Sequence, residues 1–243
     1  MVEVIRVTDT EDLVNQAAER FVDVARAATA PGGGINYDGV ARIVLTGGTA
    51  GIKLLEKVAG IGADLPWDKI HVFFGDERNV PATHPESNEG QAREALLSRV
   101  DIPEGNIHGY GLEGLDADAL AESAANYERV IDQFAPRGFD LHLLGMGYEG
   151  HINSLFPHTD AVREETRRVI SVLDSPKPPA ERATLTLPAV RSSQRVWLLV
   201  SGAEKAEAAA AIIGGASAED WPAAGATGAE ETLMFLADDA AGN

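Results

Sequence analysis

The chain has 243 residues, of which 44% are hydrophobic, so it can bury the core of one large α/β domain or of two small ones. No linker separates two units, and we expect a single domain over residues 1–243. The formal net charge of -18 argues against nucleic acid and anionic membrane surfaces as partners, and the absence of cysteine excludes disulfides and thiolate metal sites.

Helical patterns and apolar strands alternate along the sequence. Thr8 and Glu11 fit a capping box before an amphipathic helix over 9–29, and further helices are predicted over 51–58, 87–97, 117–134 and 203–213. Buried strands are predicted over 40–45, 70–74, 139–144, 168–173, 196–200 and 232–236. This order predicts a three-layer, Rossmann-like α/β domain whose mostly parallel sheet is covered by helices on both faces.

Four polar or glycine-rich segments directly follow predicted strands: 46–49, 75–78, 145–151 and 201–202. Ligands of parallel sheets bind beyond the carboxyl ends of the strands. We therefore expect these four segments to meet in one cleft.

Gly145, Gly147 and Gly150 form a G-x-G-x-x-G pattern after a strand, which is typical of a dinucleotide site. Such a site needs a long helix that starts at the third glycine, and Pro157, only seven residues beyond Gly150, would break that helix. The turn is therefore expected to serve another chemistry.

Glu149 and His151 stand one residue apart on this turn. A neutral imidazole is a natural general base near neutral pH, and an adjacent carboxylate can fix its tautomer. The alternative is a structural histidine, which is how we interpret His142 within the apolar strand. His151 and His158 lack the spacing of a metal motif, so neither a metal nor another cofactor is predicted.

Asp76, Glu77 and Arg78 follow the strand over 70–74. Arg78 could bind a carboxylate or a phosphate through two hydrogen bonds, or it could pair with its acidic neighbours on a solvated loop. Its position after a buried strand favours a place in the cleft.

Phosphate ligands are expected in three further places. The turn from Thr46 to Gly51 offers backbone N–H groups before a helix, which suits a monophosphate, although a plain strand-to-helix turn has the same sequence pattern. Lys177 and Arg182 lie on or beside a proline-stiffened segment, and Lys205 lies near the start of a helix. Each of these cations could instead be solvated.

Seven short motifs follow one another over nearly the whole chain: Leu45 to Thr49, Asp76 to Pro81, Ser87-Asn88, Leu144 to His151, Ser154 to Pro157, Ser175 to Pro179 and Thr184 to Pro188. Together they closely resemble the 6-phosphogluconolactonase family. Two departures are Glu149, where the family often has Asp, and Thr46 with Thr49 in a first turn that is often rich in Ser. Both substitutions preserve the chemical group.

The resemblance implies a metal-independent hydrolase of the pentose phosphate pathway, which opens 6-phospho-D-glucono-1,5-lactone to 6-phosphogluconate. His151 matches the family's proposed base. We hypothesise that His151 activates water, that Glu149 supports the imidazole, and that Arg78 or the N–H groups of the turn stabilise the oxyanion. The phosphate is assigned to Thr46, Gly47, Gly48, Thr49, Lys177, Arg182 and Lys205.

Two other functions stay open at this point. One is an amino-sugar phosphate deaminase or isomerase on the same fold, and the other is a non-catalytic sugar-phosphate sensor. A sensor needs an output module, and no helix-turn-helix or basic DNA-binding face is recognisable. The only partner expected is the small phosphorylated sugar lactone, in the cytoplasm, because the N-terminus lacks a signal-like pattern and no apolar run has the length of a bilayer. The oligomeric state stays open, and a monomer is compatible with the sequence.

Overall fold

The computed structural model describes residues 2–242 and contains two sheets. The larger is a six-stranded parallel sheet with the order β1-β9-β8-β5-β2-β3. Its strands are β1 (Glu3–Val7), β2 (Ala41–Leu45), β3 (Ile70–Phe74), β5 (Leu141–Gly145), β8 (Arg195–Val200) and β9 (Glu231–Ala237). The smaller sheet is antiparallel, in the order β4-β7-β6, and consists of β4 (Asp76–Arg78), β7 (Arg182–Leu185) and β6 (Val169–Val172).

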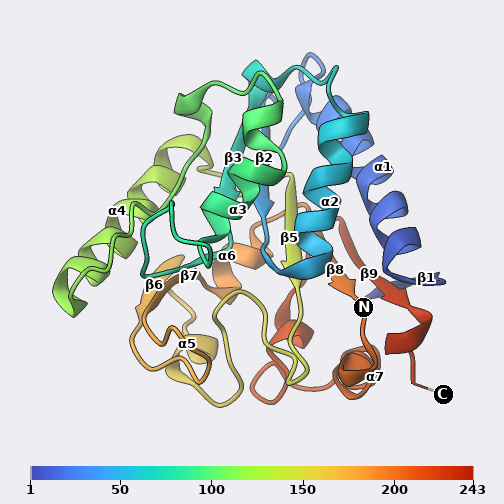
Figure 1. Cartoon of the computed structure of the whole chain (residues 1–243), viewed down its shortest axis with the longest axis vertical. Helices are drawn as coiled ribbons and strands as arrows, with labels where there is room; N and C mark the ends of the chain where they lie inside the picture. Colours follow the sequence, from blue (N-terminus) through green and yellow to red (C-terminus); the bar gives the residue numbers. More distant parts are fainter. Residues whose placement is uncertain (1, 243) are drawn as a thin grey trace.

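Helices flank the parallel sheet and the small sheet. They are α1 (Thr10–Thr29), α2 (Gly48–Ile61), α3 (Asn88–Ala95), α4 (Ala117–Phe134), α5 (Asp160–Arg163), α6 (Leu187–Arg191) and α7 (Ala206–Ile213). In Figure 1, α1 and α2 run beside each other at the right and α4 lies at the left, while the small sheet and α5 lie below α4. None of the helices among residues 2–242 has the length and apolar character needed to cross a bilayer.

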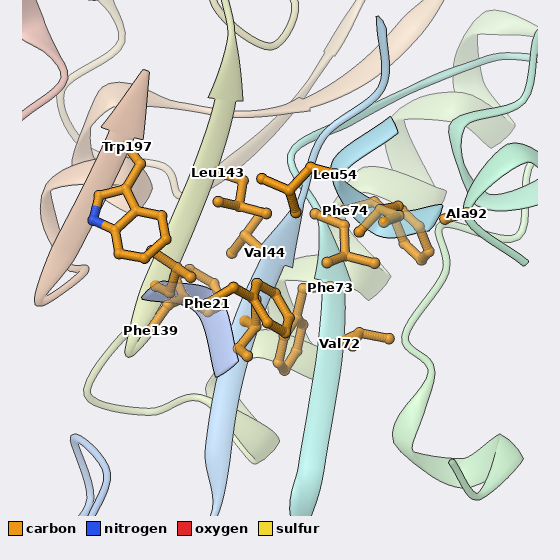
Figure 2. Packing of buried hydrophobic residues seen from close by; sticks show 14 of the residues in the cluster. Phe21, Val44, Leu54, Val72, Phe73, Phe74, Ala92, Phe139, Leu143 and Trp197 are labelled. Carbon is orange, nitrogen blue, oxygen red and sulfur yellow. The ribbon is translucent and has the colours of Figure 1, made fainter. Parts of the chain in front are cut away.

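Both faces of the parallel sheet are buried, as its alternating side chains show. In β8, Trp197 and Leu199 pack into one apolar cluster with α1 and α2, whereas Val196, Leu198 and Val200 pack into a second cluster with α7. Figure 2 shows part of the first cluster, where Phe21 and Leu54 meet side chains of the central strands. The predicted α/β fold, with a mostly parallel sheet between layers of helices, is confirmed.

Details at the start of the first two helices differ from the prediction. The cap of α1 is Asp9, whose side chain accepts from the Asp12 N–H, and not Thr8 with Glu11. The Asp12 carboxylate in turn accepts from the backbone N–H of Thr8, so the capping pattern is shifted by one residue. Helix α2 starts at Gly48 and not at Gly51, which makes most of the predicted turn its first helical turn.

The assignments of four strands also change. The strand predicted over 168–173 forms, but it pairs antiparallel with β7 in the small sheet and is not part of the parallel sheet. Residues 76–78, expected in a loop, form β4. Neither β1 nor β7 was predicted, because β1 is short, with exposed charges at Glu3 and Arg6, and β7 begins with a charged residue, Arg182.

Candidate active site

A cavity of about 310 Å³ lies beyond the carboxyl ends of β2, β3 and β5. Three of the four segments predicted to meet do so here. The fourth, 201–202, is not among the lining residues, although Glu204 and Lys205, which follow it closely, are. The lining consists of Thr46 to Gly51, Asp76, Arg78, Asn88, Gly145 to Tyr148, His151, Asn153, Lys177, Arg182, Leu199, Glu204 and Lys205. The cleft expected from the strand ends is therefore present.

The turn after β5 is closed by backbone hydrogen bonds within the glycine motif. The N–H of Gly147 donates to the His151 carbonyl, and the N–H of Gly150 donates to the Gly147 carbonyl, both at 3.0 Å. No helix follows until the four-residue α5, as expected from Pro157 and unlike a dinucleotide site. Position 147 requires a glycine for a steric reason, because a Cβ there would lie 2.0 Å from His151 Nδ1 and 2.4 Å from Glu149 Oε2.

His151 and Glu149 contact each other directly. Nδ1 of the imidazole is 3.1 Å from Glu149 Oε2, and the ring stacks on Phe156 with a centroid distance of 4.4 Å. Burial by itself raises the pKa of the Glu149 carboxyl, but hydrogen bonds from His151 and Lys177 outweigh it and hold the pKa at about 2. The carboxylate is therefore charged at neutral pH and can fix the tautomer that leaves the other ring nitrogen, Nε2, free to accept a proton.

Lys177 is close to this pair. Its Nζ is 2.8 Å from Glu149 Oε1 and 3.4 Å from His151 Nδ1, and it lies over the Tyr148 ring at 4.7 Å from the centroid. Because Lys177 lines the cavity, one cation faces both the carboxylate and the ligand space. Sequence reasoning had placed this lysine with the phosphate and could not detect its contact with Glu149.

Arg182 holds the loop that carries Lys177. Its Nε donates to the Pro179 carbonyl and its Nη2 to the Lys177 carbonyl, both at 2.9 Å, and Nη1 lies 3.3 Å from Ser154 Oγ. The side chain is only 4% exposed, and burial lowers the pKa of its guanidinium. Most of its donors are thus directed to the protein, although the residue also lines the cavity.

The turn after β2 presents open backbone to the cavity. Gly47 caps α2 without a side-chain hydrogen bond, and Gly48 has φ +78 with nothing within 4 Å of the place that a Cβ would take. Thr46 Oγ1 accepts from the Gly145 N–H at 3.1 Å, which ties this turn to the one after β5. Free N–H groups at the start of a 14-residue helix attract an anion.

Lys205 approaches the same cavity from the segment after β8. Burial lowers the pKa of its amine, and the neighbouring Glu204 opposes this shift. The structure thus brings Lys205 into one cavity with Thr46, Gly47, Gly48 and Thr49, four of the other residues assigned to a phosphate from the sequence.

In β4, Asp76 and Glu77 are buried and Arg78 is partly buried, so this segment does not form a solvated loop. Glu77 is 4% exposed and accepts hydrogen bonds from Ser87 Oγ and from the N–H groups of Asn88 and Glu89, so it caps α3; burial raises the pKa of this carboxyl. Asp76 accepts from Ser154 Oγ at 2.6 Å. Within residues 2–242, Arg78 forms no ion pair with either carboxylate, so the pairing considered from the sequence is wrong.

The guanidinium of Arg78 faces the cavity from β4. Its Nη1 donates to Asn88 Oδ1 at 2.6 Å and to the Glu86 carbonyl at 3.2 Å. Its Nε is buried, and no partner for it occurs in the described part of the chain. The sequence indicated Asn88 only as part of the Ser87-Asn88 motif, so its contact with Arg78 is an addition to the site.

Among the histidines of the described chain, His151 is the one that lines the cavity. His142 is fully buried, as its place in an apolar strand predicted, and burial lowers the pKa of its imidazole to about 3. His158 is mostly exposed, 3.4 Å from Glu219. Among residues 2–242, no three histidine or acidic side chains cluster closely enough to hold a metal ion.

Comparison with known proteins places these features in a family. The family model described as "Glucosamine-6-phosphate isomerases/6-phosphogluconolactonase" matches residues 8–235. The chain is 50% identical over 244 residues to the 6-phosphogluconolactonase of Mycobacterium tuberculosis, covering 96% of this chain and 94% of that protein. It is 39% identical to that of Streptomyces coelicolor, with 96% and 91% covered.

Solved structures agree with these sequence relatives. The crystal structure of 6-phosphogluconolactonase from Thermotoga maritima superimposes with a TM-score of 0.82 at 28% identity, and the match covers 98% of this chain and all of that one. A monomeric glucosamine-6-phosphate deaminase matches with a TM-score of 0.79 at 22% identity and shares the fold. The fold itself is therefore common to both activities.

Proposed function

Because this chain belongs to the glucosamine-6-phosphate isomerase and 6-phosphogluconolactonase family, we propose that it is a single catalytic domain that hydrolyses 6-phospho-D-glucono-1,5-lactone to 6-phospho-D-gluconate. The observation that carries the proposal is the contact of 3.1 Å between Glu149 Oε2 and Nδ1 of His151, whose side chain lines a cavity shared with the open start of α2. The 50% identity to lactonases over nearly the whole chain favours this reaction over deamination.

In the proposed reaction, Nε2 of His151 takes a proton from a water molecule, and the resulting hydroxide attacks the lactone carbonyl carbon. Glu149 accepts the Nδ1–H of the ring and stabilises the imidazolium that forms. When the tetrahedral intermediate collapses, the bond between the carbonyl carbon and the ring oxygen breaks, and His151 returns its proton to that oxygen. The ring opens to a carboxylic acid, which ionises.

The negative oxygen of the intermediate needs hydrogen-bond donors. Arg78 is suited to this role, because its Nε is buried beside the cavity and finds no partner within residues 2–242. The turn after β5 can add only its remaining N–H groups, because those of Gly145, Gly147 and Gly150 already donate within the protein. Such donors stabilise the transition state because they point at the place where charge develops.

The phosphate is proposed to bind at the start of α2. The backbone of Thr46, Gly47, Gly48 and Thr49 supplies N–H groups, and Lys205 supplies a cation, with Lys177 and Arg182 farther along the cavity wall. Binding energy from the phosphate then positions the carbonyl at His151. The lactone without a phosphate should therefore be a poor substrate.

A direct test is acid release by the purified protein with freshly prepared 6-phosphogluconolactone, corrected for the spontaneous reaction. We expect turnover of this lactone, much slower turnover of unphosphorylated gluconolactone, and no ammonia from glucosamine 6-phosphate. Treatment with a chelator should leave the rate unchanged. Ammonia release without lactone turnover would assign the chain to the deaminase branch, and loss of activity restored by a divalent metal would contradict the metal-independent mechanism.

A further inference from the structure

Asn153 has the most unusual environment among the polar residues of the cavity wall. Both polar atoms of its amide are buried, and neither finds a hydrogen-bond partner within residues 2–242. Buried polar atoms are nearly always paired, because leaving them unpaired costs free energy. An explanation is therefore needed for an amide at this position.

The backbone conformation at position 153 explains only in part why an asparagine stands there. Asn153 has φ +48, a left-handed conformation that asparagine tolerates better than most residues. Asparagine in this conformation commonly bonds the local backbone through its side chain, and here it does not. Glycine would fit the same backbone without burying an unpaired amide.

The surroundings hold Asn153 in place at the cavity. Its neighbour Ser154 is fully buried, with its N–H bonded to Thr184 Oγ1 at 3.1 Å and its Oγ bonded to Asp76 Oδ2 at 2.6 Å. The amide packs against Gly75 at the end of β3, where a Cβ would lie only 2.2 Å from Asn153 Oδ1. The absence of a side chain at Gly75 thus makes room for this amide.

The cations of the cavity wall do not supply what an asparagine amide supplies, and the amide of Asn88, which also lines the cavity, is already bonded to Arg78 and Asp76. Arg78, Lys177, Arg182 and Lys205 are donors only, which suits a phosphate. The hydroxyls of a sugar both donate and accept, and the amide offers one acceptor and two donors. Asn153 follows His151 by two residues, so a ring whose carbonyl lies at His151 brings its hydroxyls to this part of the wall.

We propose that Asn153 is a substrate-binding residue whose amide turns from Gly75 into the cavity and hydrogen-bonds a ring hydroxyl of the phosphorylated lactone. This inference rests on the proposed function. In the free protein the amide is held against Gly75, out of contact with water. The ring hydroxyl of the substrate then supplies the hydrogen-bond partner that the Asn153 amide lacks in the free protein.

The test compares Asn153→Gly, which removes the amide and suits φ +48, with Asn153→Asp, which keeps the shape but replaces the donors by a negative charge. Both should lower kcat/KM on the phosphorylated lactone about tenfold, mainly through a higher KM, as the loss of one substrate hydrogen bond implies. The melting temperature of Asn153→Gly should stay at or above that of the wild type, because an unpaired buried amide has been removed.

Asn79→Ala is the matched control. Asn79 is also buried, but its amide is fully engaged with Leu115 and Glu181 away from the cavity. This variant should lower the melting temperature and leave kcat/KM unchanged. If Asn153→Gly lowers the melting temperature and leaves kcat/KM unchanged, as expected for Asn79→Ala, Asn153 has a structural role and the proposal is wrong. The proposal is also wrong if neither the melting temperature nor kcat/KM changes in Asn153→Gly.

Calorimetric binding of 6-phosphogluconate separates this inference from the proposed function, since the product carries the ring hydroxyls of the lactone and requires no turnover. Asn153→Gly should weaken its binding about tenfold relative to the wild type. Equal affinities would overturn the role of Asn153 even if the wild type hydrolyses the lactone. Weaker binding in a protein without lactonase activity would keep Asn153 as a sugar ligand and reject the reaction.

Discussion

The turns after β2 and β5 both place glycines beside the cavity, for opposite reasons. After β5, a Cβ on Gly147 would occupy the space in which His151 and Glu149 meet, 2.0 Å from Nδ1 and 2.4 Å from Oε2. After β2, a Cβ on Gly48 would meet nothing within 4 Å, and the residue has φ +78. One glycine makes room for catalytic side chains, and the other leaves backbone open to a ligand.

The strongest test of this difference is Gly147→Ala. The added methyl group should separate His151 from Glu149 and lower kcat by about a hundredfold or more, the range expected for loss of a general base. Phosphate-dependent binding of the product should change little, because the turn after β2 is untouched. Turnover near the wild-type rate would show that the contact between His151 and Glu149 is not needed.

Gly48→Ala should act on binding and not on chemistry. Its methyl group would project beside the proposed phosphate site from a backbone conformation that costs alanine about 1–2 kcal/mol. We expect KM to rise about tenfold with kcat nearly unchanged, as loss of ground-state binding implies. A fall in kcat with unchanged KM would remove the distinction between the two turns.

Gly60→Ala is the control for Gly48→Ala. Gly60 is exposed on the same helix and has no positive φ, and no atom of the described chain lies within 4 Å of the place that its added methyl group would take. The substitution should leave kinetics unchanged and raise stability by about 0.5–1 kcal/mol, because alanine has less freedom in the unfolded chain.

Thr46→Val tests the link between the turns. It removes the hydrogen bond from the Gly145 N–H to Thr46 Oγ1, worth about 1 kcal/mol of stability. The loss of kcat/KM should be only a few-fold in the kinetic assay, and Thr46→Ser should retain wild-type behaviour. Equal effects of both substitutions would show that the hydroxyl does not connect the turns.

The smallest expected effect is on stability at acid pH, to which the turn after β5 should contribute and the turn after β2 should not. The pKa of Glu149 is held at about 2, below its ordinary value of 4.5, so its stabilising contribution is complete above pH 4.5 and is lost as the pH falls toward 2. The difference in unfolding free energy between the wild type and Glu149→Gln should therefore shrink over that range in denaturant titrations. For Gly48→Ala the difference should stay constant with pH, since this turn carries no titrating side chain.

The pattern of apolar residues predicted the helices and the central strands. A helix buries one face, which gives a regular spacing of apolar residues, and a central strand buries both faces, which gives a short apolar run. The 117–134 helix matches α4, and the 70–74 strand matches β3. The small sheet was missed, although its strand β6 was predicted, because β4 is short and charged: it consists of Asp76, Glu77 and Arg78, and its two carboxylates are bonded by side chains from other parts of the chain. Sequence periodicity carries no information about such tertiary pairing.

The site was predicted as a set of residues but not as a set of contacts. Strand ends indicated that Thr46, Arg78 and His151 would share a cleft, which they line together. The contact of Lys177 with Glu149 and the unpaired amide of Asn153 depend on how separate loops pack. These two features were therefore visible only in three dimensions.

The most direct test of the central claim is the kcat of His151→Ala on 6-phosphogluconolactone, measured together with its affinity for 6-phosphogluconate. The account predicts that kcat falls by roughly a hundredfold or more while the product still binds as in the wild type, because the base is lost and the phosphate site is intact. Unchanged turnover in this variant would contradict a mechanism in which the imidazole of His151 activates the water.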